Sequence, residues 1–319
     1  MSNYPNKKNA LQKDTDFSTI INGFLGGAEI VDLSHHIGNT PPCTLIQTGE
    51  NIPTTETEHG ESVGVSFRTT KVNNLYLNYG THIDFPGHLH EINNCRRIGE
   101  YKIEKFIAEA VIVDVSDKVR NISQYFSDDA HLDFDKFGRG DEFVKKLLEI
   151  LDSLEISLDF FKEKINGESI CDKSIIFYTG LSKHWQNRIF NGWQYAYFIN
   201  PFISGELADF LVKCKVKNVG VDALQLEHPI INLEGREWGA ILSDKYKEKV
   251  LSKLSDISKN MIHKKLLKND ILIIENLTNV EPLLGRKNII FAVPPKISLT
   301  GCTDNSIVRA FAMTFPPNN

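Results

Sequence analysis

The stretch LYLNYGTHIDFPGHLHE, residues 75–91, holds the side chains best suited to chemistry. Three of the chain's ten histidines, His82, His88 and His90, lie in it together with Asp84. The β-branched and aromatic residues before it predict extended backbone, in which alternate side chains share one face. His82 and Asp84 therefore face the same way, and imidazole and carboxylate are ligand types that Zn²⁺ and Mn²⁺ accept. The spacing predicts a divalent metal site.

Two further residues shape this stretch. Gly80 removes a side chain before His82 and lets the backbone bend, whereas Pro86 cannot donate to a strand ladder, so we expect the strand to end there. A lone His-x-Asp is also typical of a hydrogen-bonded pair at a strand end, with the other histidines on the surface. The longer run GTHIDFPGH favours a functional site over that alternative.

The run resembles the signature of the putative cyclase family, H-x-G-T-H-x-D-x-P-x-H, which includes bacterial kynurenine formamidases and isatin hydrolases. This chain has N-Y-G-T-H-I-D-F-P-G-H, so every fixed position matches except the first, where Asn78 replaces histidine. The resemblance runs from VDLSHHI near the start to the C-terminal strand. It implies an α/β fold with a mixed, barrel-like β-sheet core and surrounding helices, the swivelling β/β/α fold of this family.

The resemblance also implies a ligand set. His82 and Asp84 match family ligands, and His263 and Glu275 have the separation of the two residues that complete the family's metal site. Asp84 and Glu275 are then able to bridge two ions, with His263 binding the second. From the residues alone, a lysine-flanked histidine is typical of a surface position, whereas a carboxylate ending the apolar strand ILIIE needs a partner. The expected cofactor is a divalent ion, Zn²⁺ or Mn²⁺.

Asn78 is the main departure from the signature. An amide oxygen binds zinc more weakly than imidazole does but suits harder ions such as Mn²⁺. We therefore expect Asn78 to be a weak ligand, and the site either to hold one ion well or to prefer manganese. His88 matches the family's proton-shuttling histidine, and imidazole suits this catalytic role because its unperturbed pKa lies near neutrality.

Such a site favours hydrolysis. A divalent ion with an open coordination position lowers the pKa of water from about 15.7 toward about 7 and polarises a carbonyl, so that water can open an amide, lactone or cyclic imide bond of a small molecule. Two alternatives stay open. One is a cyclase or lyase that stabilises an enolate, whose products would carry no oxygen from water. The other is a degenerate, non-catalytic family member, against which the joint presence of His82, Asp84, His88, His263 and Glu275 argues.

Few features bear on the substrate. Phe85, Trp185 and Trp193 suggest a flat or apolar ligand. Asp222 matches the aspartate of the family's GiDtpS segment, and Gln225 stands where that segment has serine, so Phe85 and Gln225 are candidate substrate contacts. Kynurenine formamidases carry a substrate-contacting tryptophan in the loop after the opening strand. The corresponding loop here has none, which disfavours kynurenine-type substrates.

Composition limits the partners and the compartment. The 319 residues are 41% hydrophobic and 24% charged with a net charge of −5, which gives no electrostatic footprint for nucleic acid. No apolar run approaches the roughly 18–20 residues of a membrane span, and the polar N-terminus has no signal core. Five scattered cysteines without a CxxC pair predict reduced, mostly buried thiols in the cytoplasm. The family resemblance implies a homodimer or homotetramer that acts on a small molecule.

The sequence predicts a single domain with an N-terminal leader and a helical insertion. We expect a disordered leader at residues 1–15 and a single cyclase-like metal-hydrolase domain at residues 16–319. A helical insertion is expected around residues 120–156, where apolar side chains recur at helical spacing. A short helix is expected at residues 16–25, before two glycines.

The other elements follow from local patterns. β-Branched runs predict strands in EIVDLSHHI, at residues 110–115, and in SIIFYTG, VKNVGV and ILIIENL, and two more strands in NIIFAVPPKISLTGCTDNSIVRAFAMTF. RIGEYKIEKF predicts a short helix. ISGELADFLVKC predicts an amphipathic helix with Ser204 as its N-cap.

Overall fold

The computed structural model describes residues 27–36, 54–62, 65–73, 75, 77–78, 80–89, 95–120, 141–184, 200–228, 248, 252, 261–297 and 303–316. The expected leader at 1–15, the expected helix at 16–25, and Trp185 and Trp193 lie outside these residues.

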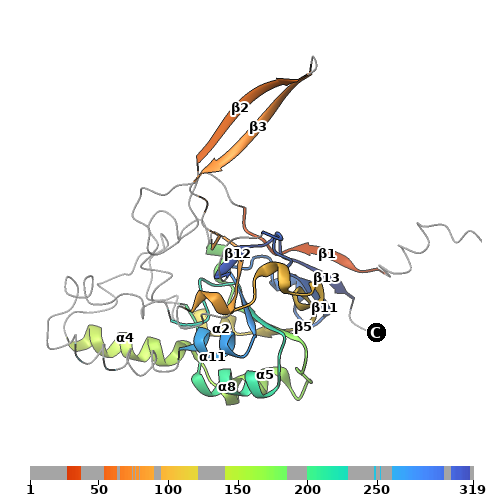
Figure 1. Ribbon diagram of the computed structural model, residues 1–319. Coiled ribbons are helices and arrows are strands. Elements are labelled where there is room, and N and C mark those ends of the chain that lie inside the picture. The colour runs from red at the N-terminus through yellow and green to blue at the C-terminus, as the bar shows by residue number, and fades with distance from the viewer. Residues whose placement is uncertain are drawn as a thin grey trace, which may run out of the picture.

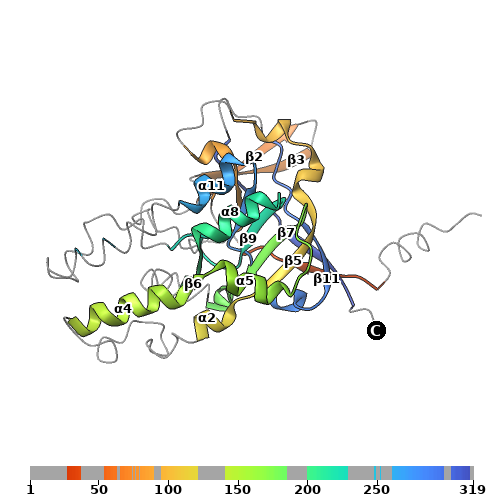
Figure 2. The same ribbon diagram turned by 90° about the horizontal axis from the view of Figure 1, so that it is seen from below.

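A nine-stranded sheet joins strands from both halves of the chain, in the order β1-β13-β11-β5-β7-β9-β10-β4-β12. The middle four strands are parallel: β5 (Ile107–Asp114), β7 (Ser174–Tyr178), β9 (Asn218–Val221) and β10 (Leu272–Glu275). Antiparallel strands extend both sides: β11 (Lys287–Phe291), β13 (Phe311–Phe315) and β1 (Glu29–Asp32) beyond β5, and β4 (His82–Asp84) and β12 (Asn305–Ile307) beyond β10. The sheet curls into a half-barrel (Figures 1 and 2), which confirms the expected mixed α/β fold with a barrel-like core.

Helices cover one face of the parallel strands (Figure 2). They are α2 (Ser116–Arg120), α4 (Asp141–Leu154), α5 (Leu158–Ile165), α8 (Gly205–Lys213) and α11 (Ile262–Lys268). The hydrophobic cluster between these helices and the sheet includes Val113, Phe177, Leu207, Leu266 and Ile273. A second cluster, on the opposite face of the sheet, includes Leu33, Ile83, Ile176, Ile274 and Ala312. Burial on both faces explains why most residues of these parallel strands are apolar.

Helix starts follow the capping chemistry of the sequence. The Ser204 side chain accepts a hydrogen bond from Leu207 N, which confirms the expected N-cap of α8. Ser157 caps α5 in the same way, through Phe160 N. The last turn of α4 buries Leu151 and Leu154, two members of the predicted helical stripe. The helix therefore lies within the expected insertion, whose boundaries as an insertion remain a prediction.

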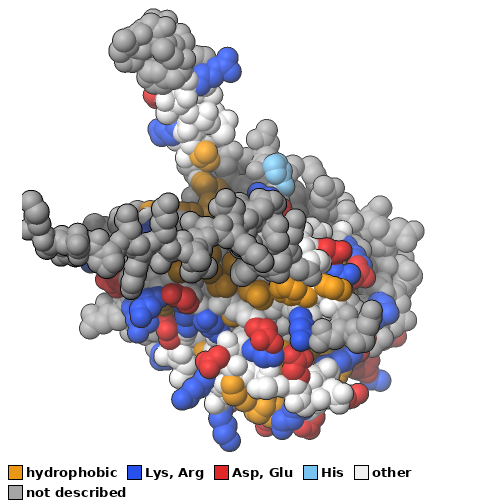
Figure 3. All heavy atoms as spheres, turned by 90° about the vertical axis from the view of Figure 1, so that its right-hand side faces the viewer, with side chains coloured by type: hydrophobic (Ala, Val, Ile, Leu, Met, Phe, Trp, Pro, Cys, Tyr) orange, Lys and Arg blue, Asp and Glu red, His pale blue; other side chains and the backbone are white. Residues whose placement is uncertain are grey.

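Several small elements complete the fold. β2 (Thr54–Ser62) and β3 (Val65–Asn73) form a two-stranded arm that stands away from the body (Figures 1 and 3). β6 (Glu155–Ile156) and β8 (Phe202–Ile203) form a short parallel pair. Single 3₁₀ turns are η1 (Pro86–His88), η2 (Ile98–Glu100), η3 (Ile103–Phe106), η5 (Leu181–His184) and η7 (Glu281–Leu283).

Two expectations about elements are corrected. The stretch RIGEYKIEKF forms the two 3₁₀ turns η2 and η3 rather than one helix. The second turn, η3, leads directly into β5, so no room is left for a longer helix. The C-terminal region contributes three strands rather than two. The additional strand, β12, has only 3 residues and pairs with β4, which lies far away in the sequence. Such a short strand has almost no local sequence pattern that would predict it.

The cysteines also differ from expectation. Cys95 is disulfide-bonded, and the two free cysteines among the described residues, Cys171 and Cys214, are exposed and half-buried. The prediction of a reduced thiol is therefore wrong for Cys95 but correct for Cys171 and Cys214, and none of the three is fully buried. Within the part of the chain that the structure describes, no helix is both long and apolar enough to cross a membrane.

Gly220 in β9 is closely packed by neighbouring strands. A Cβ atom there would lie 2.7 Å from Ile176 Cδ1 and 3.3 Å from the carbonyl oxygen of Ile274. We expect Gly220→Ala to lower the free energy of unfolding in urea by about 1–3 kcal/mol, because a packed core resists added volume. Gly99→Ala is the control, since its Cβ would meet only the flexible end of Lys296, at 3.4 Å. Equal losses for the two variants would contradict this account of β9.

Candidate metal centre

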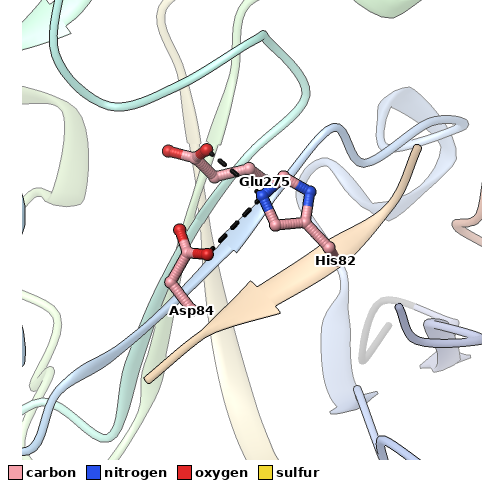
Figure 4. A group of neighbouring side chains, drawn as sticks. All are labelled: His82, Asp84 and Glu275. Carbon is pink, nitrogen blue, oxygen red and sulfur yellow. Dashed lines mark ion pairs between the residues drawn. The ribbon is translucent and has the colours of Figure 1, made fainter. Parts of the chain in front are cut away.

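The register between β4 and β10 brings the predicted ligands together. Glu275 pairs with His82, and Ile273 pairs with Asp84. Directly opposed residues in a sheet project to the same side, and so do residues two apart in one strand. His82, Asp84 and Glu275 therefore share one face, and Figure 4 shows their side chains converging.

The backbone before β4 is fixed by a turn. Gly80 has φ +64°, a conformation that glycine adopts without strain. The Thr81 hydroxyl donates to the Asn276 carbonyl at 2.6 Å and accepts from the backbone N–H of His35 at 2.9 Å. These bonds tie the start of β4 to the segments after β10 and after β1. After Asp84 the strand ends, and Pro86 opens a 3₁₀ turn, as its missing N–H predicts.

The His82 ring is oriented by the backbone. Its Nδ1 lies 2.9 Å from the Gly80 carbonyl oxygen, which can only accept a hydrogen bond, so Nδ1 donates. In the neutral ring, Nε2 then carries the lone pair. That atom lies 3.6 Å from Asp84 Oδ1 and 3.6 Å from Glu275 Oε2. The ligand atoms of His82, Asp84 and Glu275 all lie within 4.8 Å of one another.

His263 faces the same two carboxylates from the other side. It lies at the start of α11, and its Nε2 is 3.5 Å from Asp84 Oδ2 and 3.3 Å from Glu275 Oε1. Each carboxylate therefore presents one oxygen to His82 and the other to His263. The structure thus brings together all four residues expected as principal ligands.

Burial makes a cation a good fit for this cluster. The exposed fractions are 6% for His82, 1% for Asp84, 8% for His263 and 5% for Glu275. Asp84 Oδ1 is buried and has no hydrogen-bond partner. Buried carboxylates are costly unless they are paired or bind metal. Two imidazoles and two carboxylates form a donor set suited to a divalent ion such as Zn²⁺ or Mn²⁺.

The electrostatics of the cluster follow from the same contacts. Burial alone would raise the pKa of Asp84, but the nearby charges of His82, His88 and His263 and a hydrogen bond from His263 outweigh it, and the pKa is lowered. Burial likewise opposes protonation of His263, but Glu227 and Glu275 hold the pKa of this ring well above its ordinary value. The pKa of Glu227 is lowered by His263 against the effect of its own burial.

Glu227 is a site residue that sequence reasoning missed. Its carboxylate accepts the His263 backbone N–H at 2.8 Å and contacts His263 Nδ1. The neighbouring Leu226 backbone N–H donates to Glu275 Oε1 at 3.2 Å. The available signal was a carboxylate within the apolar loop LQLEHP, at the carboxyl end of a parallel strand, where ligand sites of α/β sheets form.

The remaining predicted residues lie at different distances from the cluster. His88 is exposed, and its ring centroid is 6.0 Å from that of His263, which places it at the edge of the site. Asn78 lies half-buried in the turn before Gly80, and no hydrogen bond or ion pair joins it to the described cluster residues. Gln225 is half-buried in the loop after β9.

Phe85 belongs to the core. Its side chain is 0% exposed and packs against Tyr101 and Phe106, with ring centroids 5.4 and 6.2 Å away. It shares a strand face with Ile83, opposite to the face that carries His82. In this structure the ring therefore has no open surface to offer a ligand.

Asp222, at the start of the loop after β9, is a buried structural residue. Its carboxylate accepts hydrogen bonds from the Thr179 backbone and side chain and from Gly180 N at 3.0 Å. These bonds fix the turn after β7 beside the loop after β9. Asp222 thus supports the edge of the sheet on which the cluster lies.

A family model described as Putative cyclase matches residues 20–144 and 149–228. The chain belongs to this cyclase family. The matched range contains His82, Asp84, His88 and Glu227 but ends before His263 and Glu275. The structure, rather than the family match, brings these last two residues to the site. Comparison with curated proteins gave no match.

Solved structures share the fold. An isatin hydrolase bound to the product analogue thioisatinate aligns with a TM-score of 0.61 and 16% identity, over 97% of this chain and 100% of that one. Isatin hydrolase A from Ralstonia solanacearum aligns with a TM-score of 0.60 and 15% identity, over 95% and 99%. A potential metal-dependent hydrolase with cyclase activity aligns with a TM-score of 0.51 and 17% identity, over 91% and 100%.

The pKa directions predict how the stability of the metal-free protein depends on pH. Because the pKa of folded His263 is raised, its stabilisation is complete below about 6.5 and is lost as pH rises through the folded pKa. The lowered pKa values of Asp84 and Glu227 give stabilisation that is present above about 4.5 and lost as pH falls through the folded values.

We therefore expect the melting temperature of chelator-treated protein to fall as pH rises from about 6.5. A His263→Gln variant should lack this decline, because it has no ring to deprotonate. Thermal unfolding of both proteins at matched ionic strength measures the difference. Parallel pH profiles for the two proteins would contradict the assignment to His263.

Proposed function

We propose that this protein is a metal-dependent hydrolase that opens an amide, lactone or cyclic imide bond of a small molecule. The observation that carries the proposal is the sharing of two buried carboxylates between two imidazoles. Asp84 and Glu275 each direct one oxygen toward His82 Nε2 and the other toward His263 Nε2, at 3.3–3.6 Å. With these oxygens, Asp84 and Glu275 would hold divalent cations together with His82 and His263, and the cations would activate water and polarise a carbonyl.

The ligands have separable roles in this proposal. His82, Asp84, His263 and Glu275 hold the metal, and Asn78 is at most a weak additional ligand. A bound divalent ion polarises the substrate carbonyl and lowers the pKa of water enough to supply a nucleophile near neutral pH. The surrounding core keeps the ligand side chains fixed, because three of them project from paired strands and the fourth from a helix packed on the sheet.

His88 is the proposed proton carrier. It follows Asp84 by one 3₁₀ turn, remains exposed, and its ring lies 6.0 Å from the His263 ring. An accessible imidazole at the edge of the site can take a proton from attacking water and give it to the leaving nitrogen or oxygen. None of the four ligands is free to do this, because each already faces the cluster.

The substrate class rests on the site and on the fold neighbours. The two isatin hydrolases among these favour a ring-opening hydrolysis, and the potential hydrolase with cyclase activity favours metal dependence. Gln225, half-buried in the loop after β9, remains a proposed substrate contact.

We propose that the protein acts in the cytoplasm as a homodimer or homotetramer. A monomer in analytical ultracentrifugation would contradict the proposed assembly.

The function is tested by metal removal and a substrate screen. Purified protein is stripped with chelator, reloaded with Zn²⁺ or Mn²⁺, and assayed on formamides, lactones and cyclic imides, including isatin. We expect ring or amide opening that is lost on chelation and restored by metal. In ¹⁸O-labelled water the product should carry one labelled oxygen. Product without label would favour the enolate-stabilising alternative, and activity that resists full chelation would contradict the proposal.

His88→Gln separates proton transfer from metal binding. We expect kcat to fall by about 10²-fold or more, with metal content unchanged in elemental analysis, because the ring moves a proton and is not a ligand. His36→Gln, at another exposed histidine, should leave both quantities unchanged. Loss of bound metal in His88→Gln would assign His88 to the ligand set instead.

A further inference from the structure

The loop after β9, residues 222–228, contacts two of the four proposed ligands on one side of the site. The Leu226 backbone N–H donates to Glu275 Oε1, the oxygen that faces His263. The Glu227 carboxylate accepts the backbone N–H of His263 through Oε1 and meets the ring Nδ1 through Oε2. One side chain therefore fixes both the backbone position and the ring orientation of His263.

The loop is itself held by a buried amide. Asn200 is 0% exposed, and its Nδ2 donates to the carbonyl oxygens of Gln225 at 2.8 Å and Glu227 at 3.3 Å. Its Oδ1 accepts the backbone N–H of Leu224 at 3.1 Å. Asn200 thus uses both ends of its side chain on the backbone around Glu227. Glu227 therefore supports His263, and Asn200 supports the loop that carries Glu227.

The His82 side is supported differently. The outer nitrogen of His82, Nδ1, bonds a neutral acceptor, the Gly80 carbonyl, at 2.9 Å. Asp84 Oδ1, which faces His82, receives no hydrogen bond. Asn78 occupies the position of the first signature histidine. A carboxylate on the outer nitrogen of a ligating imidazole makes it more basic than a carbonyl does, and removal of such a partner typically weakens metal affinity about 10–100-fold.

We propose that Glu227 is a positioning residue that sets the affinity of the cation position at His263, separately from the position at His82. The inference rests on the proposed metal-dependent function, because it needs an ion at each histidine. Glu227 contacts no ion or substrate in this account. It acts through His263, and the Asn200-braced loop holds Glu227 in place. The two cation positions share Asp84 and Glu275 but have independent supports.

The test is equilibrium dialysis against Mn²⁺ and Zn²⁺, with bound metal measured by elemental analysis. Wild-type protein should bind two ions per chain. Glu227→Gln keeps the size of the side chain and an acceptor for the His263 N–H but loses the charge. We expect it to weaken one of the two dissociation constants about 10–100-fold and to change the other less than twofold.

Two further variants make the result specific. Asn78→His restores the signature ligand beside His82 and should tighten the constant that Glu227→Gln leaves unchanged. Glu281→Gln removes an exposed carboxylate paired with Lys183 at 2.8 Å, away from the cluster, and should change neither constant. Circular dichroism spectra of the metal-free proteins should match across all four proteins, since a general folding defect would change them.

The outcomes separate the inference from the proposed function. Wild-type protein that binds no ion contradicts the metal-dependent function itself. One ion per chain, or two constants that Glu227→Gln leaves unchanged or shifts together, overturns the role given to Glu227 while metal-dependent hydrolysis still stands. A shift of the same constant by Glu227→Gln and Asn78→His also overturns it, because the two positions would then not be independent.

Discussion

Two carboxylates buried side by side are the constraint on which the rest of this structure depends. Asp84 and Glu275 are almost inaccessible to solvent, and burying an ionised carboxylate costs on the order of several kcal/mol unless positive charge lies close to it. Two imidazoles lie against the pair, and each faces one oxygen of each carboxylate. A protonated His263 provides positive charge in the metal-free protein, and a divalent cation provides more of it. The fold tolerates the pair only where such compensation is available.

The sheet topology explains how the compensation is arranged. β4 and β10 are far apart in sequence but pair antiparallel, so one register fixes His82, Asp84 and Glu275 on a single face. α11 packs on the adjoining part of the sheet and contributes His263. The turns after β7 and β9 meet at the carboxyl ends of the parallel strands, the edge where ligand sites form in α/β sheets. Each ligand is thus placed by regular structure, and the loop after β9 adjusts the last one.

The sequence predicted the part of this site that is local. His82 and Asp84 follow from strand alternation. The end of an apolar strand marks Glu275 as a carboxylate that needs a partner, and the family resemblance made it a ligand. His263 needed the family resemblance, since lysines follow it in a short helix and nothing local marks it as buried. Glu227 was missed because its partner lies 36 residues away. Phe85 was offered as a substrate contact, although the same alternation that groups His82 with Asp84 puts it with Ile83, on the core side.

The fold could be predicted to a similar degree. Long β-branched runs gave the parallel strands, and capping serine gave the start of α8, because both signals are local. The strand β12 and the replacement of a helix by η2 and η3 depended on pairing and connection length, which local pattern does not carry.

The decisive measurement of cation binding by the carboxylate pair is anomalous diffraction from crystals grown with saturating Zn²⁺, recorded above and below the zinc absorption edge. We expect zinc peaks between the two imidazole Nε2 atoms and the carboxylate oxygens of Asp84 and Glu275. Absence of zinc there, with His82 and His263 turned away from the carboxylates, would contradict this expectation.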